Sequence, residues 1–371
     1  MSIEDIVARL RDHAISRREL QAAMAAAGVM TVIKPLGARA QEDEQAIYFT
    51  WSGYDVPEFF PRYIEENGAP PQTPLFADNA ETFAKMRAGF QVDVTHPCAG
   101  SQVVKFREAG LIQPIDTSRL SNWPDVIPAL KELAGNVVDG DQYFVPVDWG
   151  QTSITYRTDI VDWRGEPESW SLLWNPEYSG RLSVIDAAED TWWCAAIYAG
   201  IDVHEPSAEE LAQVKALLEE QRPLLRFYSS DMTSIEQAIA SGELVAAMTW
   251  NSSPWTLLDQ GVPVKFADPK EGALTWVCGL VLATGAPHYD KAHELIDAII
   301  DTASGEFLVG EYGYGHSNIK TYDLFSDEDL AARGLARDAM SILNKGVFVL
   351  TVDPDTSTQI ENDWAEVTAG F

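Results

Sequence analysis

Strand-like and helix-like segments alternate along the chain after residue 45, and this alternation constrains the fold more than any other feature. A chain built in this way forms a parallel sheet with helices on both faces, and its ligands bind beyond the carboxyl ends of the strands. The length of 371 residues suggests two domains. We therefore expect an α/β fold. Its first strands are predicted at 46–51, 73–77 and 92–96, and its first helices at 56–67 and 79–88.

The chain is expected to cross between two lobes more than once. A short apolar strand at 143–147 is followed by Asp148-Trp149-Gly150, which we interpret as the first crossing, and the run 279–283 returns the chain to the first lobe. We find no internal repeat and no low-complexity linker. The predicted division is lobe 1 at 41–149 and about 277–325, lobe 2 at 150–276, and helices that pack across both lobes at 326–371.

The first forty residues are predicted to be an export signal. Arg17 and Arg18 precede an apolar run at 22–33, and Ala38 and Ala40 are the small residues that a signal peptidase requires. The run is too short to span a bilayer permanently. We expect a twin-arginine signal that is cleaved after Ala40 and a soluble mature protein in the periplasm. The alternative is an amphipathic cytosolic helix.

Composition and motifs argue against several classes of function. The formal charge of -31, from 57 acidic and 26 basic residues, disfavours a nucleic-acid partner. The six histidines lack metal-ligand spacing, and the chain has no Gly-x-Ser-x-Gly elbow and no phosphate-binding loop. We expect no metal, no cofactor and no catalytic residue.

The stretch 244–278 contains two tryptophans at places where strands give way to turns. Trp250 ends one predicted strand, and Trp276 follows a Pro-Lys-Glu-Gly turn at 269–272. Such positions favour a ligand platform, because binding residues concentrate where loops leave a rigid scaffold. The alternative is that both are core aromatics, which bury large areas wherever they fall.

Several short motifs follow one another in a characteristic order and spacing. They are Tyr48-Phe49-Thr50-Trp51-Ser52-Gly53-Tyr54, Gly110-Leu111-Ile112-Gln113, Trp149-Gly150, Trp174-Asn175-Pro176-Glu177-Tyr178-Ser179-Gly180, Met248-Thr249-Trp250-Asn251 and Gly313-Tyr314. Over nearly the whole mature chain this order resembles the periplasmic spermidine/putrescine-binding proteins of ABC importers. The resemblance implies a two-lobed periplasmic-binding-protein fold with a cleft between lobes, a small cationic solute and an ABC permease as partners. We expect a monomer.

The resemblance also implies which residues bind the ligand. In that family aromatic faces and carboxylates together replace the water around the bound ammonium groups. The aromatic and hydroxyl positions, carried over one at a time, are Trp51, Ser52, Tyr54, Ser230, Trp250, Trp276 and Tyr314.

The carboxylate positions of the family are matched less well. Ala187 and Asp190 stand where the family carries an aspartate and a glutamate, and Cys278 stands where it carries another aspartate. We expect other acids to substitute, first Asp148 at the lobe crossing and then Asp186, Asp190 or Asp231. For each acid the alternative is a solvated surface position. A ligand with one cationic centre, which an aromatic box alone can hold, is the alternative for the whole pocket.

Three cysteines, Cys98, Cys194 and Cys278, cannot all pair with one another. The resemblance places Cys98 and Cys278 at pocket positions on opposite sides of the cleft. A disulfide there would oppose opening, so we expect free, partly buried thiols.

The function expected from these observations is that of a solute-binding component of an ABC importer, which closes over a polyamine such as putrescine or spermidine. It is not expected to be an enzyme. One alternative is a binding protein for a mono-cationic or quaternary amine or another small solute. Another is an exported thiol-dependent enzyme that uses Cys98 or Cys278, and a third is a receptor component that presents its ligand to a signalling partner.

Overall fold

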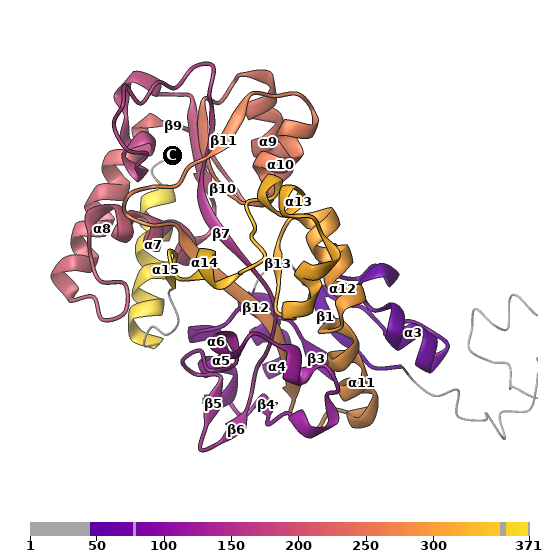
Figure 1. The fold of residues 1–371 in the computed structure, drawn as a ribbon. Coiled ribbons are helices and arrows are strands. Elements are labelled where there is room, and N and C mark those ends of the chain that lie inside the picture. The colour runs from indigo at the N-terminus through magenta and orange to yellow at the C-terminus, as the bar shows by residue number, and fades with distance from the viewer. Residues whose placement is uncertain (1–44, 77–78, 349–353, 370–371) are drawn as a thin grey trace, which may run out of the picture. The chain divides into compact units, whose positions relative to one another are not determined.

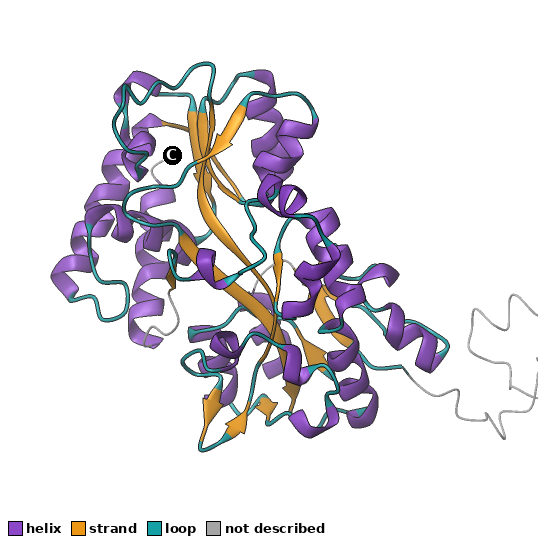
Figure 2. Ribbon diagram, viewed as in Figure 1, coloured by secondary structure: helices purple, strands orange, loops and turns teal. Residues whose placement is uncertain are grey.

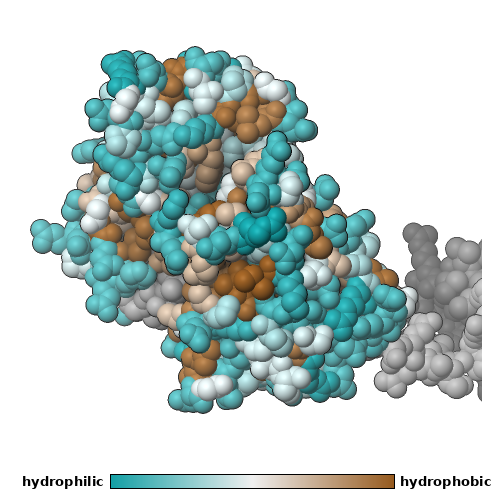
Figure 3. Space-filling model, viewed as in Figure 1, coloured by the Kyte–Doolittle hydropathy of each residue, from teal (hydrophilic) through white to brown (hydrophobic). Residues whose placement is uncertain are grey.

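The computed structural model describes residues 45–76, 79–348 and 354–369 (Figure 1). The predicted export signal at 1–40 lies outside the described residues. Within the described part of the chain, no helix combines the length and the apolar character needed to cross a bilayer. Polar residues cover most of the face seen in Figure 3, as the excess of acidic residues leads one to expect.

Two long antiparallel strands, β7 (Val145–Arg157) and β12 (Leu274–Ala283), run through both halves of the fold and join them (Figures 1 and 2). They pair from Leu274 opposite Thr152 to Leu280 opposite Val145, with a bulge after Cys278. The sequence predicted a short strand that stops at 147 before the crossing. The structure has one continuous strand instead, because neighbouring strands cover β7 along its whole length and satisfy its backbone groups.

The first lobe forms around the end of β12 that carries residues 280–283. There β3 and β4 pair antiparallel with β12, and β1 lies between β2 and β3 with all three parallel. Its strands are β1 (Tyr48–Trp51), β2 (Leu75–Phe76), β3 (Val94–Thr95), β4 (Ile112–Gln113) and β13 (Gly315–His316), with a small hairpin of β5 (Val137–Val138) and β6 (Asp141–Gln142). Its helices are α3 (Pro61–Asn67), α4 (Asn79–Arg87), α5 (Ser101–Glu108), α6 (Pro128–Lys131), α11 (Tyr289–Ile299), α12 (Thr302–Phe307), α13 (Asp327–Ala332) and α14 (Met340–Leu343).

The second lobe forms around the end of β7 that carries residues 152–157. There β10 pairs antiparallel with β7, and β8 and β9 continue the sheet parallel to β10. Its strands are β8 (Leu182–Ile185), β9 (Leu225–Ser229), β10 (Ala246–Trp250), β11 (Val264–Phe266) and β14 (Val347–Phe348), and its helices are α7 (Ala188–Ala199), α8 (Ala208–Gln221), α9 (Met232–Ser241), α10 (Ser252–Asp259) and α15 (Pro354–Ala369). The carboxyl ends of β8, β9 and β10 therefore lie at one edge of the sheet.

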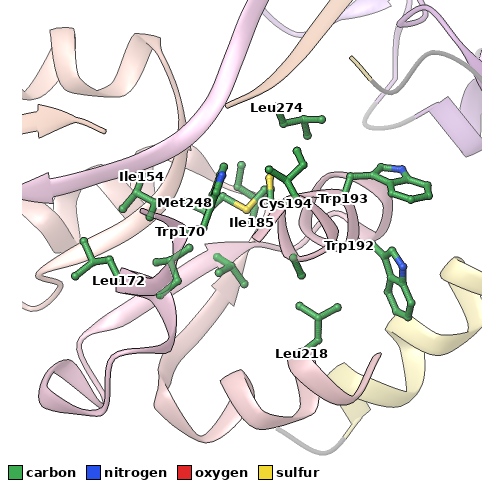
Figure 4. Close-up of a cluster of buried hydrophobic side chains, with 14 of the residues drawn as sticks. Ile154, Trp170, Leu172, Ile185, Trp192, Trp193, Cys194, Leu218, Met248 and Leu274 are labelled. Atoms are coloured by element: carbon green, nitrogen blue, oxygen red, sulfur yellow. The ribbon is translucent and has the colours of Figure 1, made fainter. Parts of the chain in front are cut away.

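Two separate cores cover the two faces of the second-lobe sheet. Met248 of β10 belongs to a core with Cys194 of α7, part of which Figure 4 shows, whereas the neighbouring Ala247 packs with Ile235 of α9 and Leu257 of α10. Because successive residues of a strand point to opposite faces, α7 and α9 lie on opposite sides of this sheet. The C-terminal helix α15 packs against α7 and α8 and also contacts α5 of the first lobe.

Local chemistry explains where two of the helices begin. Ser207 and Glu210 form a capping box at the start of α8, in which the Ser207 hydroxyl accepts from the Glu210 N–H. The predicted single helix over 56–67 is wrong. A 3₁₀ turn at Pro57–Phe59 is followed by a break at Phe60 before α3, because Pro61 has no N–H and forces the preceding residue out of the helical conformation.

Candidate functional site

A row of side chains lines one face of the sheet where the lobes meet. Trp276 of β12 pairs with Gly150 of β7, and Trp250 of β10 pairs with Thr152. Direct partners in an antiparallel pair point to the same face, as do residues two apart along a strand. The residues that the register places on one face in this way are Trp250, Trp276, Cys278 and Asp148.

Gly150 leaves the space that the Trp276 ring occupies. A Cβ atom at Gly150 would lie 2.3 Å from Trp276 Cζ2 and 2.5 Å from Asn251 Oδ1. The Trp276 ring packs edge-on against Tyr314, with the ring centroids 5.0 Å apart. The Tyr314 hydroxyl lies 3.2 Å from Ser252 Oγ at the start of α10. Strand β12, the loop that carries Tyr314 and the start of α10 thus hold the Trp276–Tyr314 pair against the backbone of Gly150.

Asn251 holds these segments together. Its Oδ1 accepts from the Gln151 N–H at 3.0 Å, and its Nδ2 donates to the Gly313 carbonyl at 2.9 Å. One buried amide therefore joins β7, the start of α10 and the loop that carries Tyr314. This explains physically why an asparagine follows Trp250 in the motif.

Asp148 is buried, and both of its carboxylate oxygens are occupied. Tyr54 Oη donates to Oδ2 at 2.6 Å, and His96 Nε2 lies 2.9 Å from Oδ1. Tyr48 Oη lies 2.8 Å from the other ring nitrogen of His96. Burial, with a contribution from the charge of Asp148, raises the pKa of Tyr54 well above its ordinary value, so this phenol remains a donor. Each carboxylate oxygen of Asp148 thus already has one hydrogen-bond partner, and the burial of the side chain limits its access to a ligand.

Trp51 is held by the first lobe. Its Nε1 donates to the His96 carbonyl at 2.7 Å, and its ring packs on Phe76 with centroids 4.4 Å apart. The side chain stays half-buried, and Ser52 beside it is exposed. Trp51 therefore has only part of its ring exposed.

Cys98 and Cys278 form a disulfide, so the expectation of free thiols is wrong. The two residues face each other as an antiparallel bridge, and the backbone on either side is hydrogen bonded as well, with the Ala99 N–H donating to Val277. The bond therefore fastens the loop before α5 to β12, where the two backbones are already paired. Cys194 is free and lies in the second-lobe core.

The acids that follow β8 differ in their partners. Asp186 is exposed and accepts from Trp364 Nε1 at 3.1 Å, while Glu189 accepts from the Ser357 hydroxyl at 2.7 Å. Asp190 is half-buried, and no described residue donates a hydrogen bond to it. Burial, reinforced by the charge of Glu189, raises the pKa of Asp190 to about 6. Asp190 is thus the predicted site acid whose carboxylate is free to meet a cation.

Ser230 and Asp231 lie in the turn between β9 and α9. Ser230 is exposed. Asp231 caps α9, since its Oδ1 accepts from the Thr233 N–H at 3.1 Å. The carboxylate of Asp231 is therefore used within its own helix.

Sequence reasoning missed two groups of this region, His96 and Glu236. His96 meets Asp148 across 52 residues of chain, and no local spacing announces that pairing. Glu236 lies on α9 and is half-buried. Burial, with smaller contributions from the charges of Asp148 and Glu236, raises the pKa of Tyr314. The only sequence signal was an acid directly after the buried Ile235 on an amphipathic helix. Among the described residues, no group of three or more His, Cys, Asp or Glu side chains could hold a metal ion.

Comparisons with known proteins agree with this architecture. Residues 99–322 match the family model for bacterial extracellular solute-binding proteins. The chain is 26% identical over 336 residues to the spermidine/putrescine-binding periplasmic protein of Salmonella typhimurium, covering 90% of this chain and 94% of that protein. It is 25% identical over 362 residues to the putrescine-binding periplasmic protein PotF of Escherichia coli, covering 93% and 96%.

A solved structure shows the same fold. The spermidine/putrescine ABC transporter substrate-binding protein PotD of Streptococcus pneumoniae superposes with a TM-score of 0.73 at 18% identity, covering 88% of this chain and 99% of that one. The predicted two-lobed α/β periplasmic-binding-protein fold is therefore confirmed.

Proposed function

We propose, because the chain belongs to the bacterial extracellular solute-binding proteins, that it captures a polyamine between its lobes and delivers it to an ABC permease. The single observation that carries the proposal is the aromatic pair of Trp276 and Tyr314 over Gly150, with the unpaired carboxylate of Asp190 on α7 of the second lobe. The relatives named for spermidine and putrescine binding support the same class of ligand.

Both parts of this site suit an organic ammonium ion. An aromatic face attracts a cation by about 0.5–2 kcal/mol per contact, and a carboxylate forms charge-assisted hydrogen bonds that fix the position of each nitrogen. The ligand would bridge the two lobes and favour the closed form by binding it more tightly than the open form. A permease could then distinguish the loaded protein from the empty one.

A ligand with one cationic centre is a second candidate. It is favoured by Asp148, whose two oxygens are occupied, and by Cys278, which is bonded to Cys98 where the resemblance leads one to expect an aspartate. The thiol-dependent enzyme loses its proposed nucleophiles, because the sulfur atoms of Cys98 and Cys278 are joined.

Isothermal titration of the mature protein with putrescine, spermidine and a panel of quaternary amines tests the proposal. We expect heat with at least one polyamine and no heat with the neutral analogue butanol. Replacement of Trp250 by alanine should weaken binding about tenfold, or 1.4 kcal/mol. The absence of heat with every cation would refute the proposed function.

We also propose the export and lobe boundaries predicted from the sequence. Cleavage after Ala40 would leave a mature periplasmic chain that begins at Gln41, with lobe 1 at 41–149 and about 277–325 and lobe 2 at 150–276. The separate hydrophobic cores on either side of the β7 and β12 crossings support this division. N-terminal sequencing of the exported protein checks the cleavage site, and Arg17→Lys with Arg18→Lys should block export.

A further inference from the structure

The second lobe holds another half-buried carboxylate that lacks a cation. Glu236 lies on α9 directly after Ile235, whose side chain packs with Leu257 of α10. Burial raises the pKa of Glu236 above its ordinary value, and the charge of Asp231 adds to this. Among the described residues, no lysine, arginine or histidine forms an ion pair with Glu236. Its charge is therefore left without compensation inside the protein.

Glu236 lies close to the aromatic pair of the cleft. The buried hydroxyl of Ser253, in the first turn of α10, forms no well-directed hydrogen bond and lies next to the Glu236 carboxylate. The preceding residue, Ser252, contacts the Tyr314 hydroxyl at 3.2 Å, and Tyr314 packs on Trp276. The carboxylate is thus within electrostatic reach of the rings that line the cleft.

Asp190 and Glu236 approach the cleft from opposite faces of the second-lobe sheet. The helix that carries Asp190, α7, packs on the face that holds Met248, whereas α9 packs on the face that holds Ala247. These helices follow β8 and β9, whose carboxyl ends mark the edge where ligands bind in sheets of this kind. Two uncompensated carboxylates therefore flank the end of β10, with the sheet between them.

We propose that Glu236 binds the second ammonium group of a ligand whose first ammonium group is bound by Asp190, so that the cleft selects dications over monocations. This inference rests on the proposed function. A partly buried carboxylate without a partner is unfavourable, and an ammonium ion supplies both the opposite charge and the hydrogen-bond donors. The aliphatic stem between the two nitrogens would lie along the rings of Trp250, Trp276 and Tyr314.

The test compares putrescine, which has two ammonium groups, with butylamine, which has one, by isothermal titration of the mature protein. In Glu236→Gln the affinity for putrescine should fall about tenfold or more, because one charge-assisted contact is lost, while the affinity for butylamine should change less than about twofold. Glu219→Gln, an exposed acid on α8, is the matched control and should change neither affinity. The shorter Glu236→Asp should keep part of the preference for putrescine.

Each outcome decides something. If Glu236→Gln binds putrescine as the wild type does, or loses both amines equally, the role of Glu236 is refuted while the proposed function stands. If wild-type protein binds neither amine nor any polyamine, the proposed function fails and this inference fails with it. A thermal melt of each variant guards against misfolding. The neutral Glu236→Gln should melt at or above the wild-type temperature, and if it does not fold, Glu236→Asp decides by the same two titrations.

Discussion

At the scale of single residues, the site depends on the absence of a side chain at Gly150. The Trp276 ring fills the space where a Cβ atom would be and makes contact with Tyr314 from there. Gly150 therefore contributes to the site because its missing side chain leaves room for the Trp276 ring. Its backbone conformation gives no separate reason for a glycine, because its φ is not positive.

We expect Gly150→Ala to displace Trp276 and to weaken binding of the best polyamine about tenfold or more, since an overpacked site costs about 1–3 kcal/mol. Titration calorimetry measures the loss. Gly310→Ala is the control, because a Cβ atom there would meet nothing closer than Phe325 at 3.9 Å, and its affinity should stay at the wild-type value. Equal affinities in both variants would show that the ring position does not matter.

Asp190 makes ligand binding depend on pH. Burial and Glu189 raise its pKa from 3.8 to about 6 in the folded protein. The folded protein therefore binds this proton more tightly than the unfolded chain does, and the carboxylate destabilises the ligand-free protein above about pH 6. As the pH falls from about 7 to about 4, Asp190 becomes protonated and the folded protein becomes more stable. The affinity for a cation decreases over the same pH range, because the neutral carboxyl group no longer attracts it.

We expect Asp190→Asn to raise the melting temperature of the ligand-free protein by roughly 2 °C or more near pH 7 and to weaken cation binding about tenfold. The wild-type affinity should fall as the pH decreases from about 7 to about 4, and the variant should lack this fall. Asp186→Asn is the control, since Asp186 is exposed and bonded to Trp364. Identical pH profiles for Asp190→Asn and wild type would remove Asp190 from the site.

At the scale of secondary-structure elements, the disulfide fixes the loop between β3 and α5. It joins Cys98 to Cys278 across 180 residues of sequence and lies beside the paired backbone of Ala99 and Val277. The start of α5 is thereby anchored to β12, one of the two strands that connect the lobes. If Cys98 and Cys278 were free thiols, the start of α5 would be tied to β12 at this point only through backbone hydrogen bonds.

We expect reduction of the disulfide to cost about 2–4 kcal/mol of stability, because a closed loop restricts the unfolded chain. The melting temperature should fall by roughly 5 °C when dithiothreitol is added. Cys194→Ser should keep this response, and Cys98→Ser with Cys278→Ser should abolish it. If the melting temperature of the wild type did not change when dithiothreitol is added, this would contradict a structural disulfide.

At the scale of the whole molecule, contacts between α5 and α7 bridge the two lobes. Glu189 of α7 interacts with Gln102 and is attracted by Lys105, both on α5 of the first lobe. The same carboxylate accepts from Ser357 of the C-terminal helix. Because these contacts join helices of different lobes, we expect them to favour the closed form without touching a ligand.

We expect Lys105→Ala to shift the equilibrium toward the open form and to weaken polyamine binding about two- to fivefold, because the attraction between the Lys105 ammonium and the Glu189 carboxylate is lost. Small-angle scattering should show a larger radius of gyration for the ligand-free variant than for the wild type. Lys291→Ala, on α11 of the first lobe, is the control. A variant that binds and scatters like wild type would show that this contact does not influence closure.

Much of the fold followed from the sequence because it rests on local patterns. The strand predicted at 46–51 and the helix predicted at 79–88 correspond to β1 and α4, since side-chain periodicity and helix-end signals act within a few residues. The continuous strand through 145–157 did not follow, because its pairing partners come from distant parts of the chain.

The sequence by itself determined the alternation of strands and helices, the order of the aromatic motifs and the acidic balance, because composition and periodicity carry these features directly. Only the tertiary structure decided which carboxylates are available. The carboxylate of Asp148 is hydrogen bonded to His96 and Tyr54. Asp190 and Glu236, in contrast, have no cationic partner among the described residues. It also decided that Cys98 pairs with Cys278, since contacts across many residues depend on how the strands are brought together.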